Sequence, residues 1–318
     1  MLLRRQYTFL IKHCTYLSKR SIAAISSQQE KPRNNLNVID FFHPSLSPGQ
    51  FYYSLNLGVA GFPKKDKTIE PIDDLTYSSI QVGDDAYFKR HDALGVADGV
   101  GGWRTHKGAN PALYSRKLMH YAQLELDRIK TSGIVGSTTA CIVILCQDEL
   151  RIANLGDCGV SVIRKNDYIF RSEEQQHSFN FPYQLGTASF DLPTDAQQFT
   201  VKIEEGDVIV LGSDGLFDNL YDDEILEEIQ KCIDQQTPLE QDHKSRMSKI
   251  VPQAISDNLA LRAKIVSEDP DNPTSPFQVK AMHEGLYYQG GKADDISVIV
   301  AIVKKDDQQS GPSPPPLP

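Results

Sequence analysis

Four short acidic phrases are the part of this sequence with the clearest chemical meaning. Each one adjoins an apolar run, and each has a glycine or a second acid beside its aspartate. The phrases are Gly83-Asp84-Asp85-Ala86, Ala97-Asp98-Gly99-Val100, Gly212-Ser213-Asp214-Gly215 and Ala293-Asp294-Asp295-Ile296. Carboxylates at strand ends, with glycine letting the backbone approach a ligand, are typical of Mg²⁺ or Mn²⁺ sites. The pattern therefore predicts a site that holds more than one divalent cation.

These aspartates are expected to act together. Asp98 ends one apolar run and can bridge two cations, while the carbonyl of Gly99 offers another hard oxygen ligand. Asp214, with Asp218 four residues later, repeats this arrangement after a second apolar run. A single Asp-Gly pair usually marks only a turn. Four such phrases beside apolar runs favour the metal interpretation.

Short β-rich runs must position these acids. They cover residues 93–97, 138–146, 150–154, 159–163, 168–171, 199–203, 208–211 and 296–303. Few residues join most of them, which favours antiparallel pairing. Helical periodicity appears over residues 111–129, 222–234 and 245–268, the last interrupted by Pro252. Many strands and few helices predict helices packed outside a sandwich of sheets.

The acidic phrases also carry a family resemblance, which further stretches share. These are Gly101-Gly102-Trp103, Gly136-Ser137-Thr138-Thr139-Ala140 and Asn154-Leu155-Gly156-Asp157. In order and content, about residues 77–304 resemble the metal-dependent serine/threonine protein phosphatases of type 2C. Residues 171–180 and 290–295 are similar to the mitochondrial branch of that family in particular. The resemblance implies an α+β fold, an α-β-β-α sandwich of two mainly antiparallel sheets flanked by helices.

The resemblance also implies two Mn²⁺ or Mg²⁺ ions at one end of the sheets, with a weaker third. Asp98 matches the ligand that bridges the two metals, and Gly99 matches the carbonyl ligand of the second. Asp214 and Asp294 match the other carboxylates of the first metal. Asp98, Asp214 and Asp294 are therefore the expected catalytic residues.

The remaining expected ligands are also carried by the resemblance. Asp84 and Asp85 match an acidic pair that holds metal-bound waters. Asp157, with Asp214 and Asp218, matches the weaker third-metal site. For Asp157 a simple turn cap is the alternative interpretation.

The expected reaction is hydrolysis of phosphoserine and phosphothreonine in mitochondrial proteins. Two cations lower the pKa of the water between them, so that this water attacks phosphorus directly. The same ions stabilise charge on the transferring phosphoryl group. Cysteine catalysis is disfavoured, because neither Cys141 nor Cys146 has an arginine at the Cys-x5-Arg spacing of a thiol phosphatase loop. Asp98 is not part of an Asp-x-Asp motif, which supplies the nucleophile in aspartyl-phosphate phosphatases, so that class of enzyme is disfavoured as well.

Two positions depart from the family pattern and leave the substrate-binding residues unassigned. Val100 stands where many relatives have a histidine that acts as a general acid, and Ile80 where an arginine grips phosphate. Candidates for these roles are His177, His106, Lys89 and Arg90. Each of these residue types is more often an ordinary surface residue.

The stretch between Asp98 and Gly136 is a larger departure, since it holds one clear helix where relatives usually have two. A missing covering helix would leave apolar area exposed on one sheet face. An inactive or weakly active binding protein with the phosphatase fold is therefore the alternative function. A shortened gene model or a splice form would explain the same gap.

The first 29 residues are basic and acid-free, with apolar residues interleaved, which is typical of a mitochondrial presequence. A disordered basic tail is the alternative. Residues 30–75 are expected to be a linker and entry segment, residues 76–305 the phosphatase domain, and residues 306–318 a disordered Pro-rich tail. The expected location is the mitochondrion, and within it the matrix.

Net charge and cysteine spacing limit the classes of molecule that the protein is expected to bind. A net charge of −9 without a basic stripe argues against nucleic-acid binding. The five cysteines have irregular spacing without a zinc pattern, which favours a reducing compartment. We expect phosphoprotein substrates, no nucleic acid, no transmembrane segment and a monomer.

Overall fold

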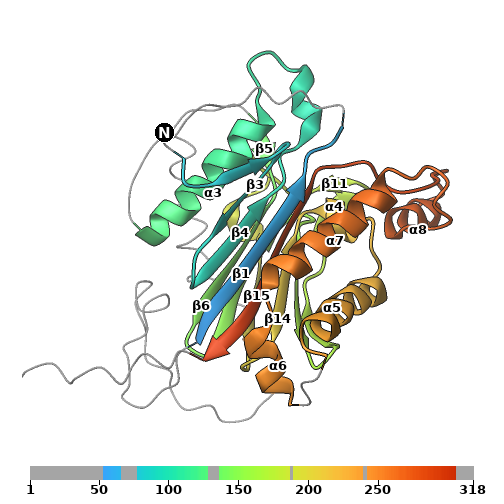
Figure 1. The fold of residues 1–318 in the computed structure, drawn as a ribbon. Helices are drawn as coiled ribbons and strands as arrows, with labels where there is room; N and C mark the ends of the chain where they lie inside the picture. The colour runs from blue at the N-terminus through green and yellow to red at the C-terminus, as the bar shows by residue number, and fades with distance from the viewer. Residues whose placement is uncertain (1–52, 66–76, 128–135, 187–188, 239–241, 306–318) are drawn as a thin grey trace, which may run out of the picture.

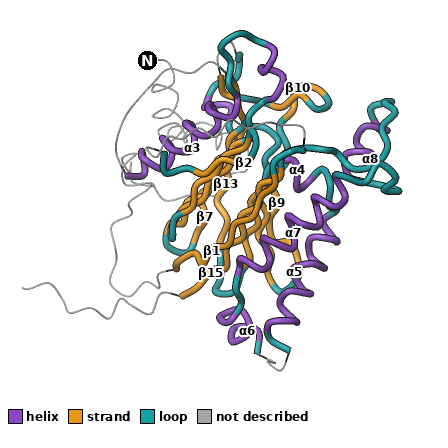
Figure 2. The backbone as a smooth tube through the Cα atoms, turned by 45° about the horizontal axis from the view of Figure 1, so that its top comes forward, coloured by secondary structure: helices purple, strands orange, loops and turns teal. Residues whose placement is uncertain are grey.

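The computed structural model describes residues 53–65, 77–127, 136–186, 189–238 and 242–305. Two antiparallel sheets pack face to face, and helices cover the outer face of each sheet (Figures 1 and 2). The order of layers is helix, sheet, sheet, helix. This arrangement confirms the α+β sandwich predicted from the sequence.

The first sheet has five strands in the order β1-β15-β14-β8-β9. Their bounds are β1 Tyr53–Phe62, β15 Ile296–Lys305, β14 Val208–Gly212, β8 Gly159–Arg164 and β9 Asp167–Arg171. Each neighbouring pair is antiparallel. The longest pairing joins β1 to β15, whose strands lie side by side in Figure 1.

The second sheet has six strands in the order β13-β7-β6-β4-β3-β2. Their bounds are β13 Gln197–Lys202, β7 Glu149–Leu155, β6 Ala140–Cys146, β4 Ala93–Ala97, β3 Asp85–Lys89 and β2 Ile80–Val82. Two small ribbons pair β5 (Ser137–Thr138) with β12 (Leu185–Gly186) and β10 (Gln176–Ser178) with β11 (Phe181–Pro182).

Strand β14 shows why continuous apolar runs are needed here. Val208 and Val210 pack in the cluster beneath the helices, while Ile209 and Leu211 pack between the two sheets. Successive strand side chains point to opposite faces, so a strand covered on both sides must be apolar throughout. The buried strand therefore gives rigid support to Ser213 and Asp214, which follow it.

Helices α5 (Asp222–Gln236), α6 (His243–Lys249) and α7 (Pro252–Ser267) contribute to the core cluster on the first sheet. The single helix predicted over residues 245–268 is in fact two, because Pro252 lacks the N–H that a helix interior needs and instead occupies the first turn of α7. Shorter helices complete the described chain: η2 Gly101–Thr105, η3 Pro193–Asp195, α4 Asp214–Phe217 and α8 Pro276–His283.

The linker interpretation of residues 30–75 is wrong for residues 53–62, which form strand β1 of the first sheet. The sequence signal is weak because only Leu55 and Gly58 are buried, without a period of two. Gly58 lies against α7, where an added Cβ would be 2.2 Å from the backbone nitrogen of Gln253. The Gln253 side chain also accepts a hydrogen bond from the amide of Val59 (3.0 Å) and donates one to its carbonyl (2.6 Å).

Helix α3 (Pro111–Asp127) covers the second sheet. Its Tyr114 and Met119 belong to one buried cluster with Ile142 and Ile144, which face outward from β6. Ile142 is 5% exposed and Ile144 is 9% exposed. The exposed apolar face expected from a missing helix is therefore not found on this strand.

Three sequence-based predictions fall outside the described residues: the presequence at residues 1–29, the linker up to residue 52 and the tail at residues 306–318. Cys141, Cys146, Cys158 and Cys232 are buried free thiols. Within the described ranges, no helix is both long enough and apolar enough to cross a membrane.

Candidate metal centre

The acids predicted from the sequence lie at the ends of strands, at one end of the sandwich. Asp85 begins β3, Asp98 follows β4 and Asp157 lies just beyond β7. Asp214 follows β14, and Asp294 precedes β15. Because β3 and β4 are antiparallel neighbours, as are β14 and β15, the start of one lies beside the end of the other. Antiparallel pairing therefore gathers acids that are far apart in sequence.

Asp98, Asp157 and Asp214 form the centre of this arrangement. Each offers one carboxylate oxygen, and these atoms all lie within 4.8 Å of one another. Asp157 and Asp214 are buried, and Asp98 is partly buried. Oδ1 of Asp157 and Oδ1 of Asp214 have no hydrogen-bond partner among the described residues. Converging carboxylate oxygens with free lone pairs fit hard divalent cations such as Mg²⁺ or Mn²⁺.

Electrostatics supports that fit. Burial raises the pKa of Asp98 well above its usual range, and the nearby Asp214 raises it further. Burial and then Asp214 have the same effect on the pKa of Asp157. Burial raises the pKa of Asp214 to about 6, although Lys292 opposes the shift. Crowded carboxylates of this kind need positive charge nearby before all of them can ionise.

Asp85 is a further buried acid, only 1% exposed. Neither of its oxygens makes a hydrogen bond of good geometry within the described residues, although the hydroxyls of Ser213 and Ser297 are close enough to lower its pKa. Burial and then Asp295 outweigh them and raise the pKa of Asp85. Asp85 is therefore suited to hold metal-bound water, which is the role expected for it.

Asp84 differs from its neighbour because an arginine engages it. Nε of Arg104 donates to Oδ2 of Asp84 at 2.9 Å, and Nη2 of Arg104 contacts Oδ1. The Asp84 side chain is fully buried, whereas the Arg104 side chain is 40% exposed. The structure thus brings Asp84 to this end of the sandwich as half of a forked ion pair.

Close backbone packing explains two of the glycines. Gly83 has φ +63°, and an added Cβ would lie 2.0 Å from Oδ1 of Asp295. Asp295 uses its oxygens to accept hydrogen bonds from the amides of Asp84 and Lys64, both at 2.7 Å. At Gly99 a Cβ would lie 2.5 Å from the carbonyl oxygen of Asp84. Only glycine allows the segments carrying Asp84 and Asp98 to approach so closely.

Two lysines hold the remaining acid, Asp218. Lys280 Nζ lies 2.9 Å from its Oδ1, and Lys292 Nζ lies 2.8 Å from its Oδ2. Lys292 Nζ also contacts Oδ2 of Asp214 and lies 3.5 Å from Oδ2 of Asp294. Burial alone would raise the pKa of Asp218, but Lys292 and Lys280 together lower it. Asp214 opens the short helix α4, and the helix predicted over residues 222–234 is α5.

Sequence reasoning missed the cations of this site. Of the candidates it chose, His177 bonds to Asp191 at 2.9 Å and Arg90 to Asp92 at 2.8 Å. His106 and Lys89 are exposed. The side chains that contact the acids are Arg104, Lys280 and Lys292. Arg104 follows Trp103 and Lys292 lies two residues before Asp294, but these positions alone do not show which acids the two cations contact.

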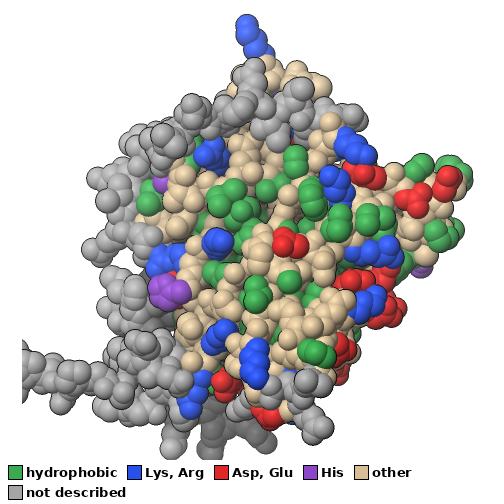
Figure 3. All heavy atoms as spheres, in the orientation of Figure 1, with side chains coloured by type: hydrophobic (Ala, Val, Ile, Leu, Met, Phe, Trp, Pro, Cys, Tyr) green, Lys and Arg blue, Asp and Glu red, His purple; other side chains and the backbone are tan. Residues whose placement is uncertain are grey.

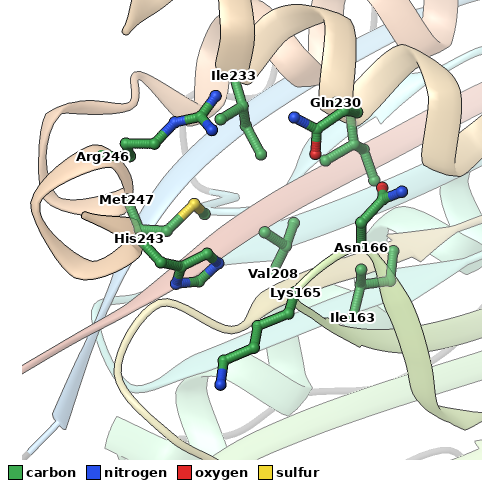
Figure 4. Close-up of a pocket in the computed structure, with 10 residues that line it drawn as sticks. Ile163, Lys165, Asn166, Val208, Gln230, Ile233, His243, Arg246 and Met247 are labelled. Carbon is green, nitrogen blue, oxygen red and sulfur yellow. The ribbon is translucent and has the colours of Figure 1, made fainter. Parts of the chain in front are cut away.

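A cavity of about 310 Å³ lies elsewhere, between β8, β14, α5 and α6 (Figure 4). Val208, which lines it, begins β14, whereas Asp214 follows the other end of that strand. The cavity is therefore separate from the metal centre. On the face shown in Figure 3, the described Lys and Arg side chains are scattered and form no continuous basic stripe.

Comparison with known proteins gives matches of three kinds. The family model described as Stage II sporulation protein E (SpoIIE) matches residues 104–270. The chain is 38% identical over 245 residues to "Probable protein phosphatase 2C 55" of Arabidopsis thaliana, covering 71% of this chain and 49% of the relative. It is 37% identical over 258 residues to "Protein phosphatase PTC7 homolog" of Danio rerio, covering 70% of this chain and 81% of the relative.

A solved structure agrees with these matches. The X-ray structure of the photosystem II phosphatase PBCP is similar with a TM-score of 0.63 and 33% sequence identity, covering 79% of this chain and 99% of that one. The human PTC7 homolog is 37% identical, with 79% of its length covered. The chain spans about half the length of the Arabidopsis relative and most of the PTC7 homologues.

Proposed function

The chain belongs to the type 2C family of protein phosphatases, and from this premise we propose that it hydrolyses phosphoserine and phosphothreonine in proteins, using divalent cations. The observation that carries the proposal is the convergence of Asp98, Asp157 and Asp214 within 4.8 Å, with free oxygens on buried carboxylates. Phosphoryl transfer to water needs little from a protein beyond positioning and positive charge. A carboxylate cluster that collects divalent cations supplies both.

Asp98, Asp157 and Asp214 would hold two Mn²⁺ or Mg²⁺ ions, with Asp85 and Asp294 at the edge of the cluster. When bound, the two ions would lower the pKa of a coordinated water and neutralise charge on the phosphoryl group. The chain fixes Asp98 through its backbone, whose amide donates to Oγ1 of Thr139 at 3.1 Å and whose carbonyl accepts from the Thr139 amide at 2.9 Å.

Arg104 is our candidate for binding the substrate phosphate. Its guanidinium is tied to Asp84 on one edge, while 40% of the side chain remains exposed. A guanidinium has five N–H donors, so a forked pair with Asp84 leaves donors for phosphate oxygens. Arg104 would thus take the role for which Ile80 is unsuited.

The proposed substrates are mitochondrial phosphoproteins, and the proposed location is the matrix. The support is the basic, acid-free composition of residues 1–29 together with the similarity to the PTC7 homologues. The inactive binding protein gains no support from the described fold, because Ile142 and Ile144 are buried and the predicted acids are all present at the strand ends.

The test is hydrolysis of p-nitrophenyl phosphate and of a phosphoserine peptide, measured with and without Mn²⁺. Asp98→Asn should lose nearly all turnover of both substrates, because it removes a central ligand. Glu227→Gln is the matched control, since it removes one carboxylate charge from an exposed position on α5. A Mn²⁺-loaded chain that hydrolyses neither substrate would favour the binding-protein alternative.

A further inference from the structure

Both oxygens of Asp218 are already engaged by ammonium groups. Lys280 contacts Oδ1 and Lys292 contacts Oδ2, at 2.9 and 2.8 Å. Lys292 also contacts Oδ2 of Asp214 and approaches Asp294. Lys292 and the two acids nearest its ammonium are well shielded, with Lys292 8%, Asp214 7% and Asp218 5% exposed. A permanent positive charge therefore lies among the acids.

The position of Lys292 is fixed by its backbone. Its amide donates to Oδ1 of Asn219, and its carbonyl accepts from Nδ2 of the same side chain, both at 2.9 Å. The preceding Gly291 packs so tightly that a Cβ would lie 1.9 Å from the carbonyl oxygen of Val266. The ring of Phe277 lies 4.9 Å from Nζ. These contacts direct the side chain inward.

The two oxygens of Asp214 face different partners. Oδ2 binds Lys292, whereas Oδ1 has no hydrogen-bond partner among the described residues. Oδ1 of Asp157 is likewise free of hydrogen bonds within those ranges. Asp157 and Asp214 thus each keep an oxygen without a hydrogen bond among the described residues, suited to a metal ion, whereas both oxygens of Asp218 contact lysines.

A third divalent cation does not fit beside Asp218. Family resemblance would place such an ion between Asp157, Asp214 and Asp218, but each oxygen of Asp218 already contacts a lysine ammonium, and a cation there would have to compete with both contacts. An ion at Asp218 would also meet two ammonium groups that already bind the same carboxylate, and like charges in a buried site repel strongly. The lysine contacts of Asp218 therefore argue against the weaker third site that the family resemblance implies.

We propose that Lys292 is a built-in cation that takes the place of a third metal, so that the protein holds two divalent ions and not three. Asp218 is then a positioning residue for Lys292, and Asp157 serves the two-metal cluster. The proposal rests on the proposed function only in that the remaining acids bind metal. It gives the site a positive charge that does not depend on the metal concentration.

The test is the number of Mn²⁺ ions bound, measured by equilibrium dialysis and elemental analysis of the full chain up to millimolar Mn²⁺ without substrate. The wild type should bind two ions, and Asp218→Asn should still bind two. Lys292→Met should bind one ion more than the wild type, because it frees Oδ2 of both Asp214 and Asp218. Lys231→Met, at an exposed lysine on α5, is the control and should bind two.

Two results would overturn the proposal. One is a wild type that binds three ions and loses one in Asp218→Asn; the other is a folded Lys292→Met protein that binds no additional ion. If Lys292→Met does not fold, as judged by circular dichroism, the Asp218→Asn comparison decides alone. A chain that binds two ions but hydrolyses no phosphoester would refute the proposed function and leave this inference intact.

Discussion

Removing the metal ions should reverse the pH dependence of stability. In the metal-free protein burial raises the pKa of Asp214 from 3.8 to about 6. A carboxyl group with a raised pKa binds its proton more tightly in the folded state than in the unfolded state. Its contribution to folding is therefore fully present below about pH 4 and is lost as the pH rises through about 6.

The magnitude follows from this shift. From about pH 5 to pH 7.5, the linkage relation gives a loss of about 1 kcal/mol of unfolding free energy from Asp214 alone. The pKa values of Asp85, Asp98 and Asp157 are raised as well, so their contributions have the same sign. For a domain of this size, about 1 kcal/mol corresponds to a fall in Tm of roughly 2–4 °C.

Bound cations should reverse the sign of this pH dependence, so that stability rises with pH, because they bind ionised carboxylates and compete with protons. Ions at about a hundred times their Kd add roughly 3 kcal/mol for each site. Calorimetry at about pH 5 and pH 7.5, with EDTA or with Mn²⁺, measures both effects. The stripped protein should melt lower at the higher pH, and the loaded protein higher. A stripped protein whose Tm rises between these two pH values would refute the reasoning, and stripped Asp214→Asn should show a smaller fall than the wild type.

Four further outcomes are expected. EDTA should abolish phosphatase turnover, and added Mn²⁺ or Mg²⁺ should restore it; turnover that persists after exhaustive chelation would contradict a metal site. Asp98→Asn and Asp214→Asn should each lower kcat at least a hundredfold with unchanged circular dichroism, since each removes metal charge and little packing. Arg104→Lys should raise KM for a phosphopeptide more than it lowers kcat, because lysine cannot form the forked contact; an unchanged KM would remove Arg104 from phosphate binding. A reporter fused to residues 1–29 should enter mitochondria, as fractionation would measure, and a cytosolic reporter would contradict the presequence.

The sandwich and its acidic end were predictable because the signals are local. An apolar run such as residues 208–211, followed by Gly212, Ser213 and Asp214, indicates both a buried strand and an acid at its end. Strand β1 was not predictable in this way, because it lacks alternating burial and depends on β15 and Gln253 for its partners.

The cations of the site were missed for a related reason. The contacts of Lys292 with Asp214 and Asp218 join positions more than seventy residues apart, and nothing in the local sequence specifies them. Asp218 was expected to be a ligand because spacing alone does not reveal which way its oxygens face. The roles of Arg104 and Lys280 likewise appear only from tertiary contacts.

The pairing of β1 with β15 sets the order in which the protein can be completed. These strands lie roughly 240 residues apart in the chain, and β15 enters the sheet between β1 and β14. Because β1 is synthesised before β15, it cannot form this pairing until almost the last described residue has been made. Asp294 lies two residues before the first residue of β15. The full set of acids is therefore assembled only after Asp294 and β15 have been synthesised, so loading of the complete metal site cannot guide the folding of the segments made before them.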